Sequence, residues 1–209
     1  QVPEHKLYKE FGVNAELLFD HAWGRESCTI AEIHSYRPSK HSLSQSQILL
    51  RNYTADEARL PMREMVESLV LELLQIKVVT KCIHVHIGYA AEDLKSTGGS
   101  RTLAHYTDSF QELCPAVLAL FDKNKRPHEL IRRIAVSFED LVNKAAVPTE
   151  MDLFSNALTD IAEQEEHIQK TMLNIKGRFG KNAILRASSL QEEGTMQFRN
   201  TMVGGHKEE

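Results

Sequence analysis

Residues 80–90 (TKCIHVHIGYA) alternate between apolar side chains and small or polar ones, and no other feature of the sequence constrains the fold as strongly. Successive side chains of a β-strand point to opposite faces of a sheet, so the alternation predicts a strand with one buried and one open face. The buried face would carry Ile83, Val85, Ile87 and Tyr89, and the open face Cys82, His84, His86 and Gly88.

Three other segments have the composition of strands: 42–53, 101–107 and 131–138. The glycine-containing stretch 96–99 is predicted to be the turn that joins the alternating strand to 101–107 in a hairpin. The sequence therefore predicts a sheet of four strands.

Two helices are predicted between these strands. The first follows Thr54, because Glu57 stands three residues later and completes a capping box. The second is capped by Asp108 or Ser109 and extends through Phe121. The order is β-α-β-β-α-β, which predicts an α+β fold of the ferredoxin-like, split β-α-β type, with both helices on one face of the sheet.

The flanking segments divide the chain into four parts. Residues 1–35 have the pattern of short helices that end at Gly24, and residues 36–142 form the predicted sheet domain. Residues 143–156 are predicted to be a linker. Residues 157–209 are predicted to be an acidic helix followed by a basic tail.

Composition argues against several classes of protein. The formal net charge is −4, so any nucleic-acid surface must be a local patch. The three cysteines form no CxxC pair, which argues against a disulfide framework or a zinc site and fits a reducing cytoplasm. No apolar run approaches the roughly 20 residues that span a bilayer. The N-terminus does not resemble a signal peptide, so we expect a cytoplasmic protein that does not contact membranes.

Three stretches of the sequence carry a resemblance to a known family. They are LFDHAWGRES followed by SLSQSQILLRNYT, then HELIRRIAVSFEDLV at 128–142, and the tail that begins GRFGKNAILR at residue 177. Together they resemble the C-terminal part of Y-family translesion DNA polymerases, and the tail is similar to the UmuC-like (ImpB/MucB/SamB) branch of Gram-positive bacteria.

The resemblance implies that 1–35 is the end of a thumb domain and 36–142 a little-finger DNA-binding domain. In this family, palm carboxylates that precede the thumb hold two metal ions, and we expect this chain to lack that segment. We therefore expect a fragment without catalytic residues, cofactor or small-molecule substrate, with Mg²⁺ bound only in the palm of the parent. The parent resembles a DNA-directed DNA polymerase that acts in translesion synthesis and the SOS-type response to DNA damage.

The resemblance also implies that the open sheet face lies over the double-stranded primer–template DNA. Such a surface grips phosphates without reading sequence. Arg132 and Arg133 follow the densest positive patch of the chain, which holds Lys123, Lys125, Arg126 and His128. The candidate DNA contacts are Ser42, Ser44, Ser46, Arg51, Arg101, Thr102, Arg132 and Arg133.

The linker contains a second candidate site, formed by Glu150, Met151, Asp152, Leu153 and Phe154. This EMDLF sequence resembles the sliding-clamp-binding pentapeptide, whose usual form is Gln-Leu-Asp/Ser-Leu-Phe. Adjacent Leu and Phe side chains can anchor a flexible segment in an apolar pocket. Glu150 and Met151 depart from the usual form, so weaker binding is expected. Leu153 and Phe154 also fit a hydrophobic staple for the following helix.

Two other functions remain open from the sequence. One is a regulatory module that binds the sliding clamp or a polymerase partner without binding DNA. The other is a metal-dependent enzyme built on His84 and His86, because an HxH pair on a strand can ligate a metal when carboxylates converge on it. No third or fourth ligand is evident near this pair, and no metal site is expected.

Overall fold

The computed structural model describes residues 3–26, 28–35, 42–147, 156–203 and 206–207, and of residues 156–162 only the helical backbone. The chain divides into two compact units, residues 1–39 and 40–209. No helix in these described ranges is long and apolar enough to cross a membrane.

Unit 1 consists of short helices: α1 (Glu4–Phe11), α2 (Asn14–Ala22) and α3 (Ile30–Ser35). Gly12 ends α1 with a φ of 56°, a conformation that glycine adopts without strain, and so separates α1 from α2. Helices of this length bury little apolar surface by themselves. Ala15 is the buried residue of α2, whereas Trp23 remains 65% exposed.

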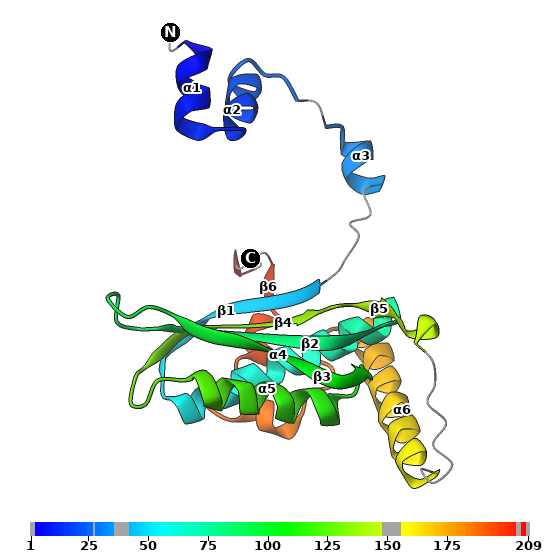
Figure 1. The fold of residues 1–209 in the computed structure, drawn as a ribbon. Coiled ribbons are helices and arrows are strands. Elements are labelled where there is room, and N and C mark those ends of the chain that lie inside the picture. The colour runs from blue at the N-terminus through cyan, green and yellow to red at the C-terminus, as the bar shows by residue number, and fades with distance from the viewer. Residues whose placement is uncertain (1–2, 27, 36–41, 148–155, 204–205, 208–209) are drawn as a thin grey trace. The chain divides into compact units, whose positions relative to one another are not determined.

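Unit 2 is built on an antiparallel sheet whose strand order is β1-β4-β2-β3. A short strand, β5 (Val142–Asn143), pairs with the start of β2. Each helical connection joins two parallel strands and skips the strand between them, which confirms the split β-α-β arrangement (Figure 1). The main strands are β1 (Ser42–Tyr53), β2 (Val78–Tyr89), β3 (Thr97–Thr107) and β4 (Ile131–Glu139).

Two helices, α4 (Ala55–Ile76) and α5 (Phe110–Asn124), cover one face of this sheet (Figure 1). The predicted capping box is present, because the Thr54 hydroxyl accepts the Glu57 N–H and the Glu57 carboxylate accepts the Thr54 N–H. Ser109 caps α5 by accepting the Glu112 N–H at 3.3 Å. Local sequence therefore sets where both helices begin.

The core lies between the sheet and these helices. The residues of 80–90 that were predicted to face inward are buried, which confirms the prediction made from the alternation. Large apolar side chains of α4 and α5 fill the space opposite them. The largest fully buried side chains include Tyr53, Phe121, Phe138, Leu49, Met62, Met65, Leu69 and Leu73.

The prediction of a turn at 96–99 is wrong for most of that stretch, because β3 begins at Thr97. Gly98 pairs with His86 inside the sheet, and a Cβ at this position would lie 2.3 Å from the Val85 carbonyl oxygen. The glycine therefore serves a close approach of two backbones rather than a turn.

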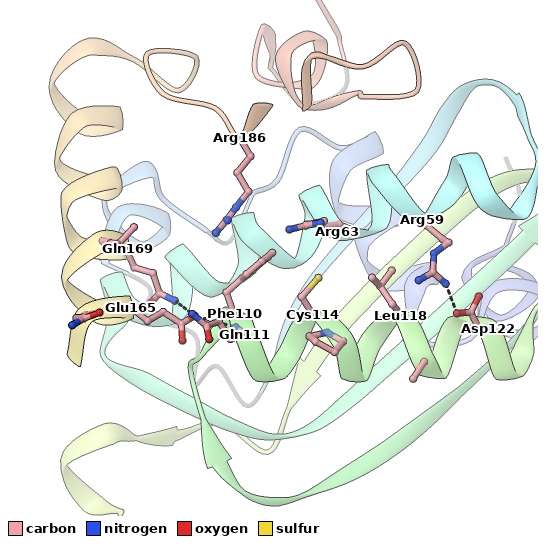
Figure 2. Close-up of a pocket in the computed structure, with 14 residues that line it drawn as sticks. Arg59, Arg63, Phe110, Gln111, Cys114, Leu118, Asp122, Glu165, Gln169 and Arg186 are labelled. Atoms are coloured by element: carbon pink, nitrogen blue, oxygen red, sulfur yellow. Dashed lines mark hydrogen bonds and ion pairs between the residues drawn. The ribbon is translucent and has the colours of Figure 1, made fainter. Parts of the chain in front are cut away.

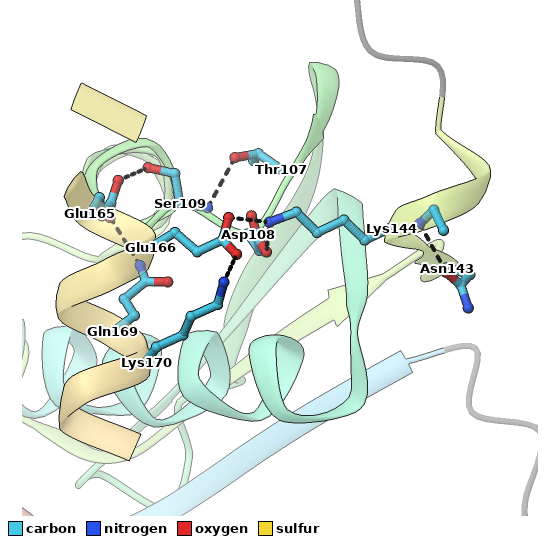
Figure 3. Close-up of polar contacts among 10 residues, drawn as sticks. Thr107, Asp108, Ser109, Asn143, Lys144, Glu165, Glu166, Gln169 and Lys170 are labelled. Carbon is cyan, nitrogen blue, oxygen red and sulfur yellow. Dashed lines mark hydrogen bonds and ion pairs between the residues drawn. The ribbon is translucent and has the colours of Figure 1, made fainter. Parts of the chain in front are cut away.

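The C-terminal part of unit 2 contains α6 (Asn156–Phe179), two 3₁₀ turns, η1 (Lys144–Ala146) and η2 (Ala187–Leu190), and α7 (Met196–Arg199). A last hairpin pairs β6 (Met202–Val203) with β7 (His206–Lys207). Figure 3 shows how α6 is held. The Lys144 ammonium bridges Asp108 (2.8 Å) and Glu166 (3.1 Å), and Glu165 accepts hydrogen bonds at the start of α5.

Candidate nucleic-acid interface

The face of the sheet that α4 and α5 do not cover, called here the open face, carries mostly small and polar side chains. The strand register places its residues in rows across the sheet. The serines of β1 are exposed, as is Ile48, which follows them on the same side. The rows are Ser42, Glu139, Cys82 and Thr102; Ser44, Ser137, His84 and Ser100; Ser46, Ala135, His86 and Gly98; and Ile48, Arg133 and Gly88.

Arg132 and Arg133 are both exposed, although consecutive residues of a regular strand point to opposite faces. A β-bulge resolves this. Gly88 pairs with Arg133 and Tyr89 with Ile131, so Arg132 is an extra residue on β4. The bulge lets Ile131 and Ile134 both face the core while both guanidinium groups reach solvent. Within the described residues, neither guanidinium group has an ion pair or hydrogen bond.

Two other candidate residues lie elsewhere. Arg51 forms an ion pair with Glu57 at 2.8 Å and lies 4.4 Å from the centre of the Tyr53 ring, so its guanidinium is occupied at the start of α4. The Arg51 hydrogen bond is the main reason that the pKa of Glu57 falls to about 2. Arg101 pairs with Ile83 and therefore lies on the helix side of β3, whereas Thr102 pairs with Cys82 on the open face.

The basic loop that precedes β4 is fixed by the hydroxyl group of Tyr89. This oxygen accepts the Arg126 N–H at 2.8 Å and lies 2.6 Å from the Thr97 hydroxyl. Lys125 forms an ion pair with Asp122 at 3.0 Å. Lys125 and Arg126 of the positive patch are thus engaged inside the domain, whereas Lys123 and His128 are exposed, as are the bulged arginines that follow.

His84 and His86 lie on the open face in neighbouring rows, each half-buried. Among the described residues no three His, Cys, Asp or Glu side chains come close enough to hold a metal ion. This part of the chain offers no ligand set for the metal-dependent alternative. The predicted clamp-binding residues, Glu150, Met151, Asp152, Leu153 and Phe154, lie outside the described residues.

Sequence reasoning missed two buried carboxylates on α4 that bind the tail, defined here as the described residues 180–203. Glu64 and Glu67 are 2% and 3% exposed. Glu64 accepts the Thr195 N–H at 2.9 Å, the Thr195 hydroxyl at 3.0 Å and the Met196 N–H at 2.8 Å. Glu67 accepts from Arg186 at 2.5 Å. The sequence signal that could have revealed them is their spacing: residues three positions apart lie on the same face of a helix, and here their neighbours on α4 are mostly apolar.

The sheet domain matches a known protein family. Residues 40–153 match the impB/mucB/samB family C-terminal domain, which covers the whole sheet and both of its helices. The chain belongs to this family. The predicted resemblance to the ImpB/MucB/SamB branch is thereby confirmed. The C-terminal helix α6 and the tail lie beyond the matched residues.

The sequence similarity to individual relatives covers more of this chain than residues 40–153. The chain is 30% identical over 213 residues to the putative UV-damage repair protein UvrX of Bacillus subtilis, covering 98% of this chain and 48% of that protein. It is 24% identical over 202 residues to a DNA polymerase IV of Oceanobacillus iheyensis, covering 94% and 45%. The chain thus spans about half the length of these relatives.

Among solved structures, an insertion ternary complex of Dbh DNA polymerase has a TM-score of 0.36 and 16% identity. That superposition covers 68% of this chain and 39% of the other. The family assignment rests on the sequence match of residues 40–153.

Proposed function

We propose that this chain is the DNA-gripping C-terminal part of a Y-family translesion polymerase and holds primer–template duplex against its open face. The observation that carries the proposal is the β-bulge that exposes Arg132 and Arg133 at the end of a face of small polar side chains. Serine hydroxyls and guanidinium groups are donors suited to phosphate oxygens, and a flat polar surface can approach a backbone closely. The family match and the names of the relatives support the same role.

The other residues of the proposed contact are Ser42, Ser44, Ser46 and Thr102, all on the open face. Arg51 and Arg101 are left out, because one is paired with Glu57 and the other lies on the helix side of β3. In this proposal the chain supplies grip. Nucleotide transfer belongs to the part of the relatives' length that the chain does not match.

The test is the affinity of the chain for a primer–template duplex across a salt series. Each phosphate contact by Lys or Arg contributes about 0.9 to the slope of log affinity against log salt. We expect the double change Arg132→Ala and Arg133→Ala to lower affinity and to reduce this slope by about one to two units. The matched control is Arg178→Ala with Lys181→Ala, which removes the same charge from the exposed end of α6 and the start of the tail. Equal losses in both double variants would overturn the assignment to the bulge.

We further propose that residues 150–154 tether the protein to a sliding clamp. The support is the sequence, in which Leu153 and Phe154 stand together in a segment that joins the sheet domain to α6. Changing both to alanine should abolish clamp binding in a pull-down and leave duplex affinity unchanged. Clamp binding together with absent duplex binding by the unaltered chain would instead favour the regulatory module.

A further inference from the structure

A groove of about 690 Å³ runs along the outer side of α5, on the helix layer (Figure 2). Its floor is an apolar stripe of α5, in which Phe110, Cys114 and Leu118 recur at every fourth position. The exposed side chain of Ile168 on α6 also lines the groove. This volume lies within the range of pockets that bind small-molecule ligands.

Three arginines, Arg59, Arg63 and Arg186, line this groove from α4 and from the segment after α6. The groove also contains the carboxylates of Asp122 and Glu165, and both are engaged. Asp122 pairs with Arg59 and Lys125. Glu165 accepts hydrogen bonds from Ser109, Gln111 and Gln169. The donors to Glu165 are neutral and leave its negative charge in place, so the lining holds three arginines against two carboxylates, a formal excess of one positive charge.

Arg63 is the source of that unbalanced charge. Its guanidinium lies 5.7 Å from the centre of the Phe110 ring, and among the described residues it has no carboxylate partner. Arg186 lies 4.2 Å from the same ring and is already paired with Glu67. A guanidinium held over an aromatic ring presents its planar fork to solvent, which is the geometry that binds a carboxylate through two hydrogen bonds.

The length of the groove defines the size of its occupant. The stretch of α5 from Phe110 to Asp122 is about 18 Å long at the standard helical rise. An extended chain advances about 3.3 Å per residue, so about five residues fit along it. A matching segment carries one aspartate or glutamate at its centre, opposite Arg63. It carries apolar side chains on either side, over the stripe of α5 and against Ile168.

We propose that this groove binds an extended acidic segment of a partner protein, about five residues long, through a carboxylate on Arg63 and apolar anchors on α5. The inference goes beyond the proposed grip on DNA. The groove lies on the helix layer and the DNA surface on the opposite face of the sheet, so duplex and partner can be bound at the same time.

The probe is a set of fluorescein-labelled pentapeptides with a central aspartate flanked by Leu, Ile, Met or Phe, titrated against the full chain by fluorescence anisotropy. We expect at least one to bind saturably with a dissociation constant below about 1 mM. Replacing its aspartate by asparagine should weaken binding about tenfold, and Arg63→Gln should do the same. In the combination of both changes, the second should add nothing, because both remove one interaction. Saturating duplex DNA should leave peptide affinity unchanged.

Arg63 is exposed, so Arg63→Gln should fold normally, which a urea melt verifies. The control is Arg178→Gln, an equal loss of charge outside the groove. Failure of every peptide to bind below about 1 mM overturns the proposal, as does binding that is equal in Arg63→Gln and the unaltered chain. Analytical sedimentation of the chain tests whether the groove is instead filled by a second copy of it. Self-association that Arg63→Gln abolishes would show that a second copy of the chain fills the groove, and would also overturn it.

Discussion

Charged side chains occur on the open face of the sheet and also on the side of α4 that the tail covers, and the two groups differ in their partners. Glu64 and Glu67 are almost fully buried, and each accepts hydrogen bonds from the tail. Arg132 and Arg133 are exposed and have no such partner among the described residues. A buried charge without partners is costly, so the first pair must be structural, whereas the second pair is free to bind a ligand.

The difference also separates the family domain from its extension. The matched residues end at 153, yet the tail inserts its polar groups into α4 of the matched domain. Tyr53, at the end of β1, donates its hydroxyl to the Glu193 carbonyl at 3.3 Å. Arg199, whose pKa burial lowers, donates to Ser68 at 2.9 Å. The tail therefore completes the helix layer, while the described residues of unit 2 give the open face no comparable cover.

The strongest way to break this comparison is to remove an acceptor of the tail. Glu64→Ala deletes three hydrogen bonds and leaves a small cavity, so we expect a loss of about 3 kcal/mol in the free energy of unfolding, measured by urea denaturation. Glu64→Gln keeps an acceptor oxygen and should lose less. The control Glu163→Gln changes an exposed carboxylate of α6 and should leave stability unchanged. A Glu64→Ala variant as stable as the unaltered chain would show that the tail is merely laid on the surface.

A second change sharpens the other side of the comparison. Ser44→Glu places a negative charge in the middle of the open face, where the side chain is exposed, so duplex affinity should fall about tenfold at low salt without loss of stability. Asn174→Glu adds the same charge to the exposed side of α6 and serves as the control. Equal effects on affinity would mean that only net charge matters.

The third prediction concerns the end of β1, where Arg51 and Glu57 are partnered and so resemble the buried group although they are more exposed. The pKa of Glu57 lies at about 2, below its usual 4.5, chiefly through the Arg51 hydrogen bond. Because the folded state has the lower pKa, the carboxylate stabilises the fold above pH 4.5, and this contribution disappears as the pH falls through about 2. Glu57→Gln should therefore cost about 1 kcal/mol at pH 7.

The measurement is a series of urea melts of Glu57→Gln and the unaltered chain between pH 7 and pH 2. The two free energies should converge toward the acidic end. A difference that does not depend on pH would assign the effect to packing rather than to charge.

The smallest effect is expected at Lys144, which links α6 to the sheet domain. Burial disfavours the charged form of its ammonium, but Asp108 and Glu166 outweigh this and raise its pKa. The side chain is 41% exposed, so solvent screens both ion pairs, and Lys144→Met should cost about 0.5 kcal/mol. Hydrogen exchange should show that the backbone amides of α6 around Glu166 exchange faster than in the unaltered chain. Unchanged exchange there would show that Glu165 alone holds this helix.

The sequence predicted much of the fold because several signals are local. The alternation in 80–90 fixes which face of β2 is buried, and the Thr54 and Glu57 pair fixes the start of α4. The arginine pair at 132–133 was likewise visible, and the structure leaves both side chains exposed. Gly98 was misread, because a glycine that avoids a clash between strands has the same local pattern as one in a turn.

By itself, then, the sequence determined the order of the four main strands and the two helices between them, the inward face of β2 and the family to which the chain belongs. Tertiary structure decided the strand order β1-β4-β2-β3, the bulge at Arg132, the position of Arg101 on the helix side, and the burial of Glu64 and Glu67 under the tail. The physical reason is the separation along the sequence of the residues that interact. Capping and alternation involve residues a few positions apart, whereas register, bulges and buried ion pairs depend on segments that meet only when the chain has folded.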